Sequence, residues 1–289
     1  MARNWLITGS TRGFGRELAI AALDHGDNVV ATARRPEQLG DLASSYGAHV
    51  RPVGLDVTDP VAARAAVQVA VDEFGSLDVV VNNAGYAVSA AIEEMTDDDF
   101  RAQIETNLFG VVNVTKAALP VLRRQRSGHF IQFSSIGGRV GGTPGMGAYQ
   151  TAKFAVEGFS EVLNAEVKPL GIKVTIIEPG GFRTDWGGSS MGTPPVGADY
   201  EPTVGQMNHF RESTVASWAG DPKRAAQIIV DVADLDDPPL RLLLGAGALE
   251  SAANSSRARA MEAELWSAVS RSADFGAAPV PVAPASSPG

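Results

Sequence analysis

Three residues in the middle of the chain have the types and the spacing of an acid/base site. Tyr149 and Lys153 are four residues apart in a segment with helical periodicity, so their side chains share one face of a helix. A lysine cation there favours the phenolate and lowers an ordinary tyrosine pKa of about 10 towards neutrality. Ser135 comes just after the apolar run HFIQF, where its hydroxyl could bind a substrate carbonyl. Taken alone, the pair could be a surface tyrosine packed on a lysine stem, and the serine could cap a turn.

Other kinds of catalysis fit the sequence less well. A serine nucleophile needs a histidine base and a GxSxG turn, and residues 130–160 contain neither. The chain has no cysteine, which excludes disulfides and thiol chemistry. The histidines His25, His49, His129 and His209 lack the spacing of metal ligands, so no metal is expected.

A glycine-rich turn near the amino terminus, TGSTRGFG, predicts a phosphate site. Gly9, Gly13 and Gly15 stand between an apolar run and a helical pattern. A strand that runs through such a turn into a helix presents unpaired N–H groups and the positive end of the helix dipole to a ligand. A purely structural corner is the alternative, but its place after the first strand of an alternating chain favours a dinucleotide site.

The end of the second expected strand indicates which dinucleotide is bound. An acidic residue there would hold the ribose 2′-hydroxyl of NAD, but this strand ends in Ala33, Arg34 and Arg35. An arginine suits a 2′-phosphate, and Arg12 in the glycine turn could reach the same group. Ordinary solvated arginines are the alternative. We therefore expect NADP(H) in preference to NAD(H), with NAD(H) as a second option.

Four other segments end at the same edge of the expected sheet. Asn82 and Asn83 precede a small Ala84-Gly85 corner, and Asp56 ends the third strand, where it could bond an adenine amino group. Asn107 lies inside an expected helix, where asparagine is unfavourable unless it is exposed or has a specific role. Residues 179–181, Pro-Gly-Gly, form a bend that could cover one face of a nicotinamide.

The elements that must position these residues alternate along the chain, which predicts an α/β fold with a parallel sheet and helices on both faces. Strands are expected at residues 4–8, 28–33, 49–55, 77–82, 128–134, 172–177 and 240–244. Helices are expected at residues 14–25, 36–46, 60–74, 97–126, 147–169, 221–234 and 249–270. Residues 1–275 are expected to form one domain in which 187–220 cover the substrate and include a short helix, and 276–289 are expected to be a disordered tail.

Composition favours a small-molecule enzyme. The formal net charge of −9 argues against nucleic acid or an anionic membrane as a partner. The chain shows no apolar run of the roughly 20 residues that span a bilayer, so a cytoplasmic protein is expected.

With TGSTRGFG, NNAG, Asn107, Ser135, YQTAK and PGGFRT in this order, residues 3 to 250 resemble the short-chain dehydrogenase/reductase family in its single-domain form. The resemblance implies a Rossmann-type doubly wound sheet of seven parallel strands, a nicotinamide cofactor, and hydride transfer at a carbonyl or secondary alcohol. It implies that Tyr149 is the acid/base and that Lys153 binds the nicotinamide ribose and lowers the tyrosine pKa. It also implies that Ser135 positions the carbonyl and that Asn107 holds a water in a proton relay. The cofactor contacts that it implies are Gly9, Arg12, Gly13, Phe14, Gly15, Arg34, Asp56, Val57, Asn83, Gly85, Tyr149, Lys153, Pro179, Gly180, Phe182 and Thr184.

Several alternatives stay open. Fourteen positions separate Ser135 from Tyr149, long for the family, so we expect a bulge in residues 137–145 and keep Ser134 as the second candidate carbonyl ligand. A non-catalytic NADP(H)-binding sensor and a dehydratase or epimerase of the same fold are the rival functions. The resemblance also implies a homodimer or homotetramer built on the helices at 97–126 and 147–169. The apolar side chains expected either to line a substrate pocket or to pack a small helix are Trp186, Met191, Tyr200, Met207, Phe210 and Trp218.

Overall fold

The centre of the molecule is a sheet of seven parallel strands in the order β3-β2-β1-β4-β6-β7-β9. The strands are β1 (Asn4–Ile7), β2 (Asn28–Ala33), β3 (Val50–Gly54), β4 (Val79–Asn82), β6 (Gly128–Phe133), β7 (Ile172–Pro179) and β9 (Arg241–Leu244). The computed structural model describes residues 2–184 and 191–283. Within them every expected strand is found, and the predicted Rossmann-type α/β fold is confirmed.

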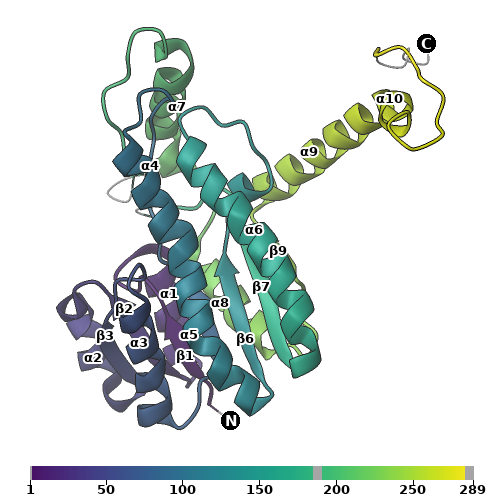
Figure 1. Ribbon diagram of the computed structural model, residues 1–289. Coiled ribbons are helices and arrows are strands. Elements are labelled where there is room, and N and C mark those ends of the chain that lie inside the picture. Colours follow the sequence, from purple (N-terminus) through teal and green to yellow (C-terminus); the bar gives the residue numbers. More distant parts are fainter. Residues whose placement is uncertain (1, 185–190, 284–289) are drawn as a thin grey trace.

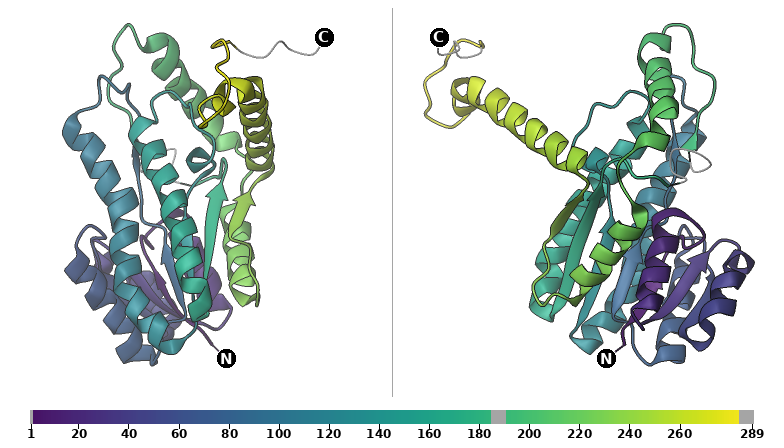
Figure 2. Two further views of the ribbon diagram at one scale, coloured as in Figure 1. Left: turned by 45° about the vertical axis from the view of Figure 1, so that its right-hand side comes forward. Right: turned by 180° about the vertical axis from the view of Figure 1, so that it is seen from behind.

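Helices cover both faces of this sheet (Figures 1 and 2). One face carries α3 (Pro60–Phe74), α4 (Asp97–Ile104), α5 (Gly110–Gln125) and α6 (Gly147–Val167). The other carries α1 (Gly13–Asp24), α2 (Gly40–Tyr46) and α8 (Pro222–Asp234). Short 3₁₀ turns complete several connections: η1 (Pro36–Leu39), η2 (Gly47–His49), η4 (Ile136–Gly138), η5 (Lys168–Leu170) and η8 (Val215–Ser217).

The sequence starts two of these helices with the same pair of residues, Asp-Pro. The Asp59 carboxylate accepts from the N–H groups of the first turn of α3, and Asp221 does the same for α8. Proline follows each aspartate. At the first position of a helix the N–H group has no acceptor within the helix, so proline loses no hydrogen bond there, and its fixed φ suits a helix.

Alternation along the strands divides the core between the two faces. In β1, Trp5 and Ile7 pack with Leu18 of α1 and Ile229 of α8, while Leu6 packs into the cluster formed by α3, α5 and α6. Because the sheet is buried on both faces, β1 is apolar at nearly every position.

The strand order reverses beside β1, which lies between β2 and β4. In open α/β sheets a crevice forms at this point, outside the carboxyl ends of the strands, and ligands bind there. The glycine turn after β1, the Asn-Asn-Ala-Gly segment after β4 and the serines after β6 all end at this edge. The fold therefore gathers residues that are far apart in sequence.

The structure departs from the expected helices in two places. The helix expected over 97–126 is interrupted by a π-turn, η3 (Glu105–Phe109), between α4 and α5. The helix expected over 249–270 is α9 (Ala246–Leu265) followed by α10 (Ser267–Arg271), and the two form an arm that projects away from the sheet (Figures 1 and 2). In the described residues no helix combines the length and the apolar character that a bilayer crossing needs.

Above the crevice lies a segment that contains a second, smaller sheet. β8 (Met191–Gly192) pairs with β5 (Ala87–Val88), and η7 (Glu201–Gly205) leads into α7 (Gln206–Thr214), the short helix expected near this point. Figure 1 shows α7 beside the amino-terminal end of α4, on the same side of the molecule as the carboxyl ends of the strands.

Candidate active site

Ser135 and Tyr149 meet at the carboxyl edge of the sheet. Tyr149 lies in the first turn of α6 and is 7% exposed. Its phenol is hydrogen-bonded to the hydroxyl of Ser135, which also accepts from the N–H of Gly137 across 3.0 Å and so caps η4. It is therefore Ser135 that contacts the tyrosine, while the second candidate, Ser134, is buried beside it.

Lys153 is one turn further along α6 and is 5% exposed. Its Nζ donates to the carbonyl oxygen of Phe133 across 2.7 Å and lies 5.7 Å from the centre of the Tyr149 ring. Burial lowers the pKa of Lys153 to about 8, and the nearby Glu157 carboxylate raises it. The hydrogen bond thus fixes the position of the ammonium, while burial makes it more acidic than an ordinary lysine.

The pKa of Tyr149 differs from the sequence-based expectation. Burial raises it to about 12, and the hydrogen bond with Ser135 lowers it only in part. The Lys153 ammonium donates to the carbonyl oxygen of Phe133 in β6 and not to the phenol, so it does not lower the pKa of Tyr149 towards neutrality. At neutral pH Tyr149 is a protonated phenol.

Asn107 lies in the π-turn η3 and is fully buried. Its Oδ1 accepts from the N–H of Tyr86 across 3.0 Å, and its Nδ2 donates to the Tyr86 carbonyl across 2.8 Å. A β-carbon on Gly85 would lie 2.4 Å from the Asn107 Oδ1 and 3.8 Å from the Lys153 Nζ. The asparagine that seemed out of place in a helix therefore fixes the β4–β5 connection against the lysine.

The glycine turn is as tight as its sequence predicts. Gly9 has a φ of +70°, which favours glycine. A β-carbon on Gly15 would lie 2.3 Å from the Gly9 carbonyl oxygen and 2.4 Å from the Asn83 Nδ2, so no side chain fits there. Asn83 itself donates to the carbonyl oxygens of Thr8 and Gly9, across 2.8 and 3.2 Å. Its amide holds the turn in shape.

These residues fit a dinucleotide. Next to the turn begins α1, whose first N–H groups are not capped by the side chain of Arg12. The turn leads to a cavity of about 100 Å³. Its lining includes nearly all of the expected nicotinamide-side and catalytic residues: Phe14, Asn83, Gly85, Asn107, Phe133, Ser134, Ser135, Tyr149, Lys153, Pro179, Gly180, Phe182, Thr184 and Trp218.

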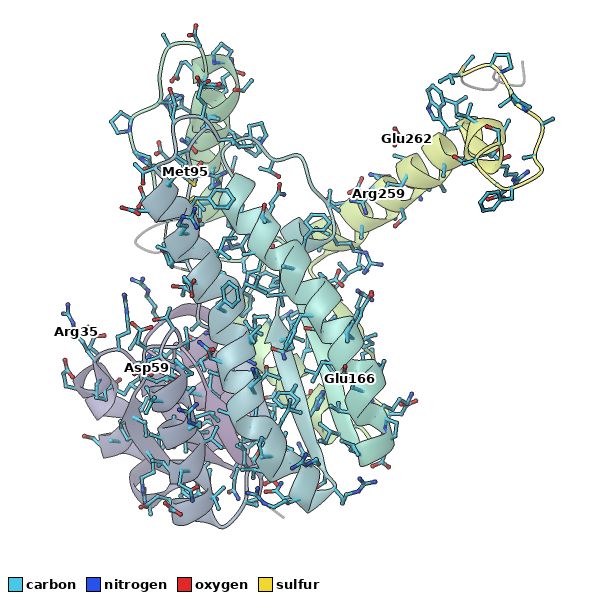
Figure 3. The ribbon with its side chains drawn as sticks, viewed as in Figure 1. Arg35, Asp59, Met95, Glu166, Arg259 and Glu262 are labelled. Atoms are coloured by element: carbon cyan, nitrogen blue, oxygen red, sulfur yellow. The ribbon has the colours of Figure 1, made fainter. Side chains whose placement is uncertain are left out.

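The expected adenosine side lies at the ends of β2 and β3. Asp56 Oδ1 accepts from the Thr58 hydroxyl and N–H across 2.7 and 3.0 Å. These bonds lower the pKa of Asp56, and the Arg34 cation lowers it further, which places Arg34 near this carboxylate. Arg12, Arg34 and Arg35 are all exposed, and Figure 3 shows Arg35 at the periphery of the molecule.

Comparison with known proteins decides the family. The family model for short chain dehydrogenases matches residues 3–192. The chain belongs to the short-chain dehydrogenase family. An oxidoreductase of Botryotinia fuckeliana, BOA17, is 50% identical over 267 residues, which cover 92% of this chain and 97% of that protein.

Two solved structures resemble this short-chain dehydrogenase along most of its length. A short-chain dehydrogenase from Streptomyces avermitilis has a TM-score of 0.88 and 38% identity, over 95% of this chain and 100% of the other. ElxO, solved with NADP bound, has a TM-score of 0.73 and 29% identity, over 86% of this chain and 100% of the other. The protein is thus an oxidoreductase of this family.

The remaining residues expected at the site of this short-chain dehydrogenase differ in their surroundings. The Val57 side chain is buried against Gly110, and its carbonyl accepts from Asn113. Of the apolar side chains expected over the substrate, Met191 packs against Tyr149 and Trp218 lines the cavity. Three others do not reach it: Phe210 is 62% exposed, Tyr200 bonds Glu93, and Met207 is half-buried outside the cavity lining. Trp186 lies outside the described residues.

No cluster of three or more metal-ligating side chains occurs in residues 2–184 and 191–283. His129, for example, is a buried histidine that forms a hydrogen bond inside the core. It is 3% exposed, and its Nε2 lies 2.9 Å from the Thr175 hydroxyl.

Sequence reasoning missed three residues near the site. The Phe133 carbonyl that binds Lys153 is a backbone group, and nothing in a residue type reveals it. Glu157 had a usable signal, because it is four residues beyond Lys153 on the same helix and therefore on the same face. Arg211 of α7 is buried at 8% exposure inside a segment that reads as polar.

Proposed function

We propose that this protein is an NADP(H)-dependent reductase of a carbonyl compound, or in reverse a secondary-alcohol dehydrogenase, with Tyr149 as the acid/base. The observation that carries the proposal is the hydrogen bond between Ser135 and Tyr149, at a cavity that Lys153 also lines. A sensor that only bound the cofactor would not need a serine hydroxyl beside a buried phenol and a buried ammonium.

The protonation state of Tyr149 supports the reductive direction. Because burial raises its pKa to about 12, the phenol carries its proton at neutral pH and can donate it to a carbonyl oxygen that gains negative charge. The Ser135 hydroxyl lies beside the phenol and can turn its proton from the phenol to the same carbonyl oxygen, which would hold the carbonyl in place. The Lys153 ammonium is close enough to stabilise negative charge left on the tyrosine.

The cofactor would supply the hydride. The chain's part is to hold it: the uncapped start of α1 and the glycine turn suit a pyrophosphate, and Gly180 and Phe182 suit the nicotinamide end. Exposed Arg34 and Arg12 near the end of β2 suit a 2′-phosphate, and ElxO, at 29% identity, binds NADP. These features support NADP(H) over NAD(H).

The test is NADPH oxidation against a panel of ketones and quinones, with product analysis to detect dehydration or epimerisation. We expect turnover that Tyr149→Phe lowers by about 10²- to 10⁴-fold, the usual contribution of a general acid. Tyr46→Phe, at a tyrosine of α2 that bonds Asp24 far from the site, is the matched control and should leave turnover unchanged. If NADPH binds but no carbonyl is reduced, the protein is a sensor and the proposal fails.

A further inference from the structure

Arg211 is a buried cation above the active site. It lies on α7 and is 8% exposed. Within residues 2–184 and 191–283 no carboxylate lies within ion-pair distance of its guanidinium. The nearest acidic residue in the chain, Glu212, is exposed. The Glu212 charge acts on the guanidinium from a distance, so the protein buries this positive charge with a counter-charge nearby but with no ion pair in the described residues.

The position of this guanidinium is fixed by buried polar groups. Arg211 Nη1 donates to the Asn208 Oδ1 across 3.0 Å, and the Ser89 hydroxyl donates to the same oxygen across 2.6 Å. Asn208 and Ser89 are 7% and 0% exposed. An amide oxygen that accepts from both sides holds the arginine to the β5 end of the small sheet. The Arg211 side chain is therefore held in one position by buried hydrogen bonds, unlike an arginine on the solvated surface.

Part of the guanidinium remains available to a ligand. Both hydrogen bonds described for the Arg211 side chain come from Nη1, one to the Asn208 Oδ1 and one to the Met191 Sδ at 3.2 Å. In the described part of the chain neither Nε nor Nη2 donates a hydrogen bond, and neither is sealed from solvent. A guanidinium carries five N–H donors in a rigid fork, so these two nitrogens can still grip two acceptor oxygens.

Arg211 is linked through Met191 to the apolar cluster that contains the acid/base residue. Met191, which it contacts, belongs to β8, pairs with Ala87 of β5, and packs against the cluster formed by Ala87, Met146 and Tyr149. Arg211 lies on α7, above the crevice. The glycine turn connects β1 with α1, and Arg34 follows β2. Arg211 does not itself line the cavity of Tyr149, but it contacts Met191 and belongs to a different segment from the expected cofactor residues.

We propose that Arg211 binds an anionic group of the substrate, so that the protein acts on carbonyl compounds or alcohols that carry a carboxylate. This inference rests on the proposed function and gives its substrate class. Burial of a charge without an ion pair is unfavourable, and arginine cannot avoid that cost by releasing its proton. A carboxylate matches the planar fork and compensates the charge.

The experiment compares oxo acids with their methyl esters, in a series that varies the number of bonds between the carbonyl and the carboxylate. Reduction is followed with NADPH, and binding is followed separately as the rise in unfolding temperature of the NADP⁺-bound protein. The wild type should prefer the acid at one spacing, both in kcat/KM and in thermal shift. Arg211→Met should lower the acid-to-ester ratio of kcat/KM by about ten- to a hundredfold, the range of charge-assisted hydrogen bonds.

Two further variants keep the result interpretable. Arg211→Lys keeps the charge without the fork and should retain part of the preference, which tests the inference if the methionine variant does not fold. Arg224→Gln removes an exposed cation of α8 and should leave the ratio unchanged.

The inference fails if the wild type treats acid and ester alike, or if Arg211→Met lowers both equally. A different pattern marks failure of the proposed function: the acid stabilises the wild type but not Arg211→Met, and no compound is reduced. That pattern would support the anion site and overturn the reductase.

Discussion

Glu157 lies one helical turn beyond Lys153 on α6, and its carboxylate raises the pKa of that buried lysine. Arg241 of β9 holds Glu157, with 3.1 Å between the arginine Nε and the carboxylate Oε2. The same Nε is 3.2 Å from Glu178 of β7, which is fully buried and also binds Arg139. Charged side chains of β7, β9 and α6 therefore form one network, and its Glu157 carboxylate acts on Lys153.

This relationship predicts a pH effect. In Glu157→Gln the negative charge is lost, so the pKa of Lys153 should fall below its present value of about 8. If the ammonium is needed for turnover, the loss of activity at alkaline pH should then begin at a lower pH than in the wild type. The measurement is the pH profile of kcat/KM for NADPH-dependent reduction.

Glu161→Gln is the matched control for this prediction. Glu161 is also on α6 and also binds Arg241, but it is 53% exposed and a further turn away from Lys153. Its removal should leave the alkaline limb in place. A shift of the same size in both variants would mean that the effect is not specific to the charge of Glu157.

Cofactor choice can be tested at two adjacent arginines. Arg34→Ala should weaken NADPH binding about ten- to a hundredfold, since a charge-assisted contact to a 2′-phosphate is lost, and should affect NADH far less. Arg35→Ala is the matched control, because Arg35 lies at the periphery of the molecule (Figure 3). Fluorescence titration of both cofactors gives the dissociation constants. Equal losses for NADPH and NADH, or tighter NADH binding by the wild type, would show that Arg34 does not select the cofactor.

The sequence predicted the features that depend on local pattern. Alternation of apolar runs with helical periodicities predicted the strands and the order of the helices, because a parallel sheet needs a crossover helix between successive strands. A four-residue spacing was enough to put Tyr149 and Lys153 on one face, and the glycine turn was recognisable because Gly15 leaves no room for a β-carbon.

What the sequence could not predict depends on contacts between distant segments. The pairing of β5 with β8 joins residues about a hundred positions apart, and no local pattern encodes it. The pKa of Tyr149 was expected to fall because of Lys153, but burial raises it, and burial is a property of the folded surroundings. The burial of Arg211 likewise depends on the fold, because its guanidinium contacts Met191 of β8, twenty residues earlier in the chain.

The buried histidine of β6 predicts how stability depends on pH. The Thr175 hydroxyl donates to the Pro239 carbonyl, so its oxygen accepts from the Nε2–H of His129, and the buried Nδ1 makes no hydrogen bond in the described residues. Burial, with Lys173 and Arg3 nearby, lowers the pKa of His129 to about 3. Protonation in the folded protein would place a positive charge in this buried site, near the two cations Lys173 and Arg3, so the histidine stays neutral there.

An unfolded chain would protonate His129 near its ordinary pKa of about 6.5, so unfolding takes up a proton at lower pH. The contribution of His129 is therefore complete above about pH 6.5 and is lost as the pH falls towards 3, with roughly 2 kcal/mol gone by pH 5. His129→Gln removes the titrating group, and its free energy of unfolding in urea should fall less between pH 7 and pH 5 than that of the wild type. His209→Gln, at a histidine whose side chain is 72% exposed, should keep the wild-type slope. Identical slopes in the wild type and His129→Gln would show that the buried ring is already protonated in the folded protein.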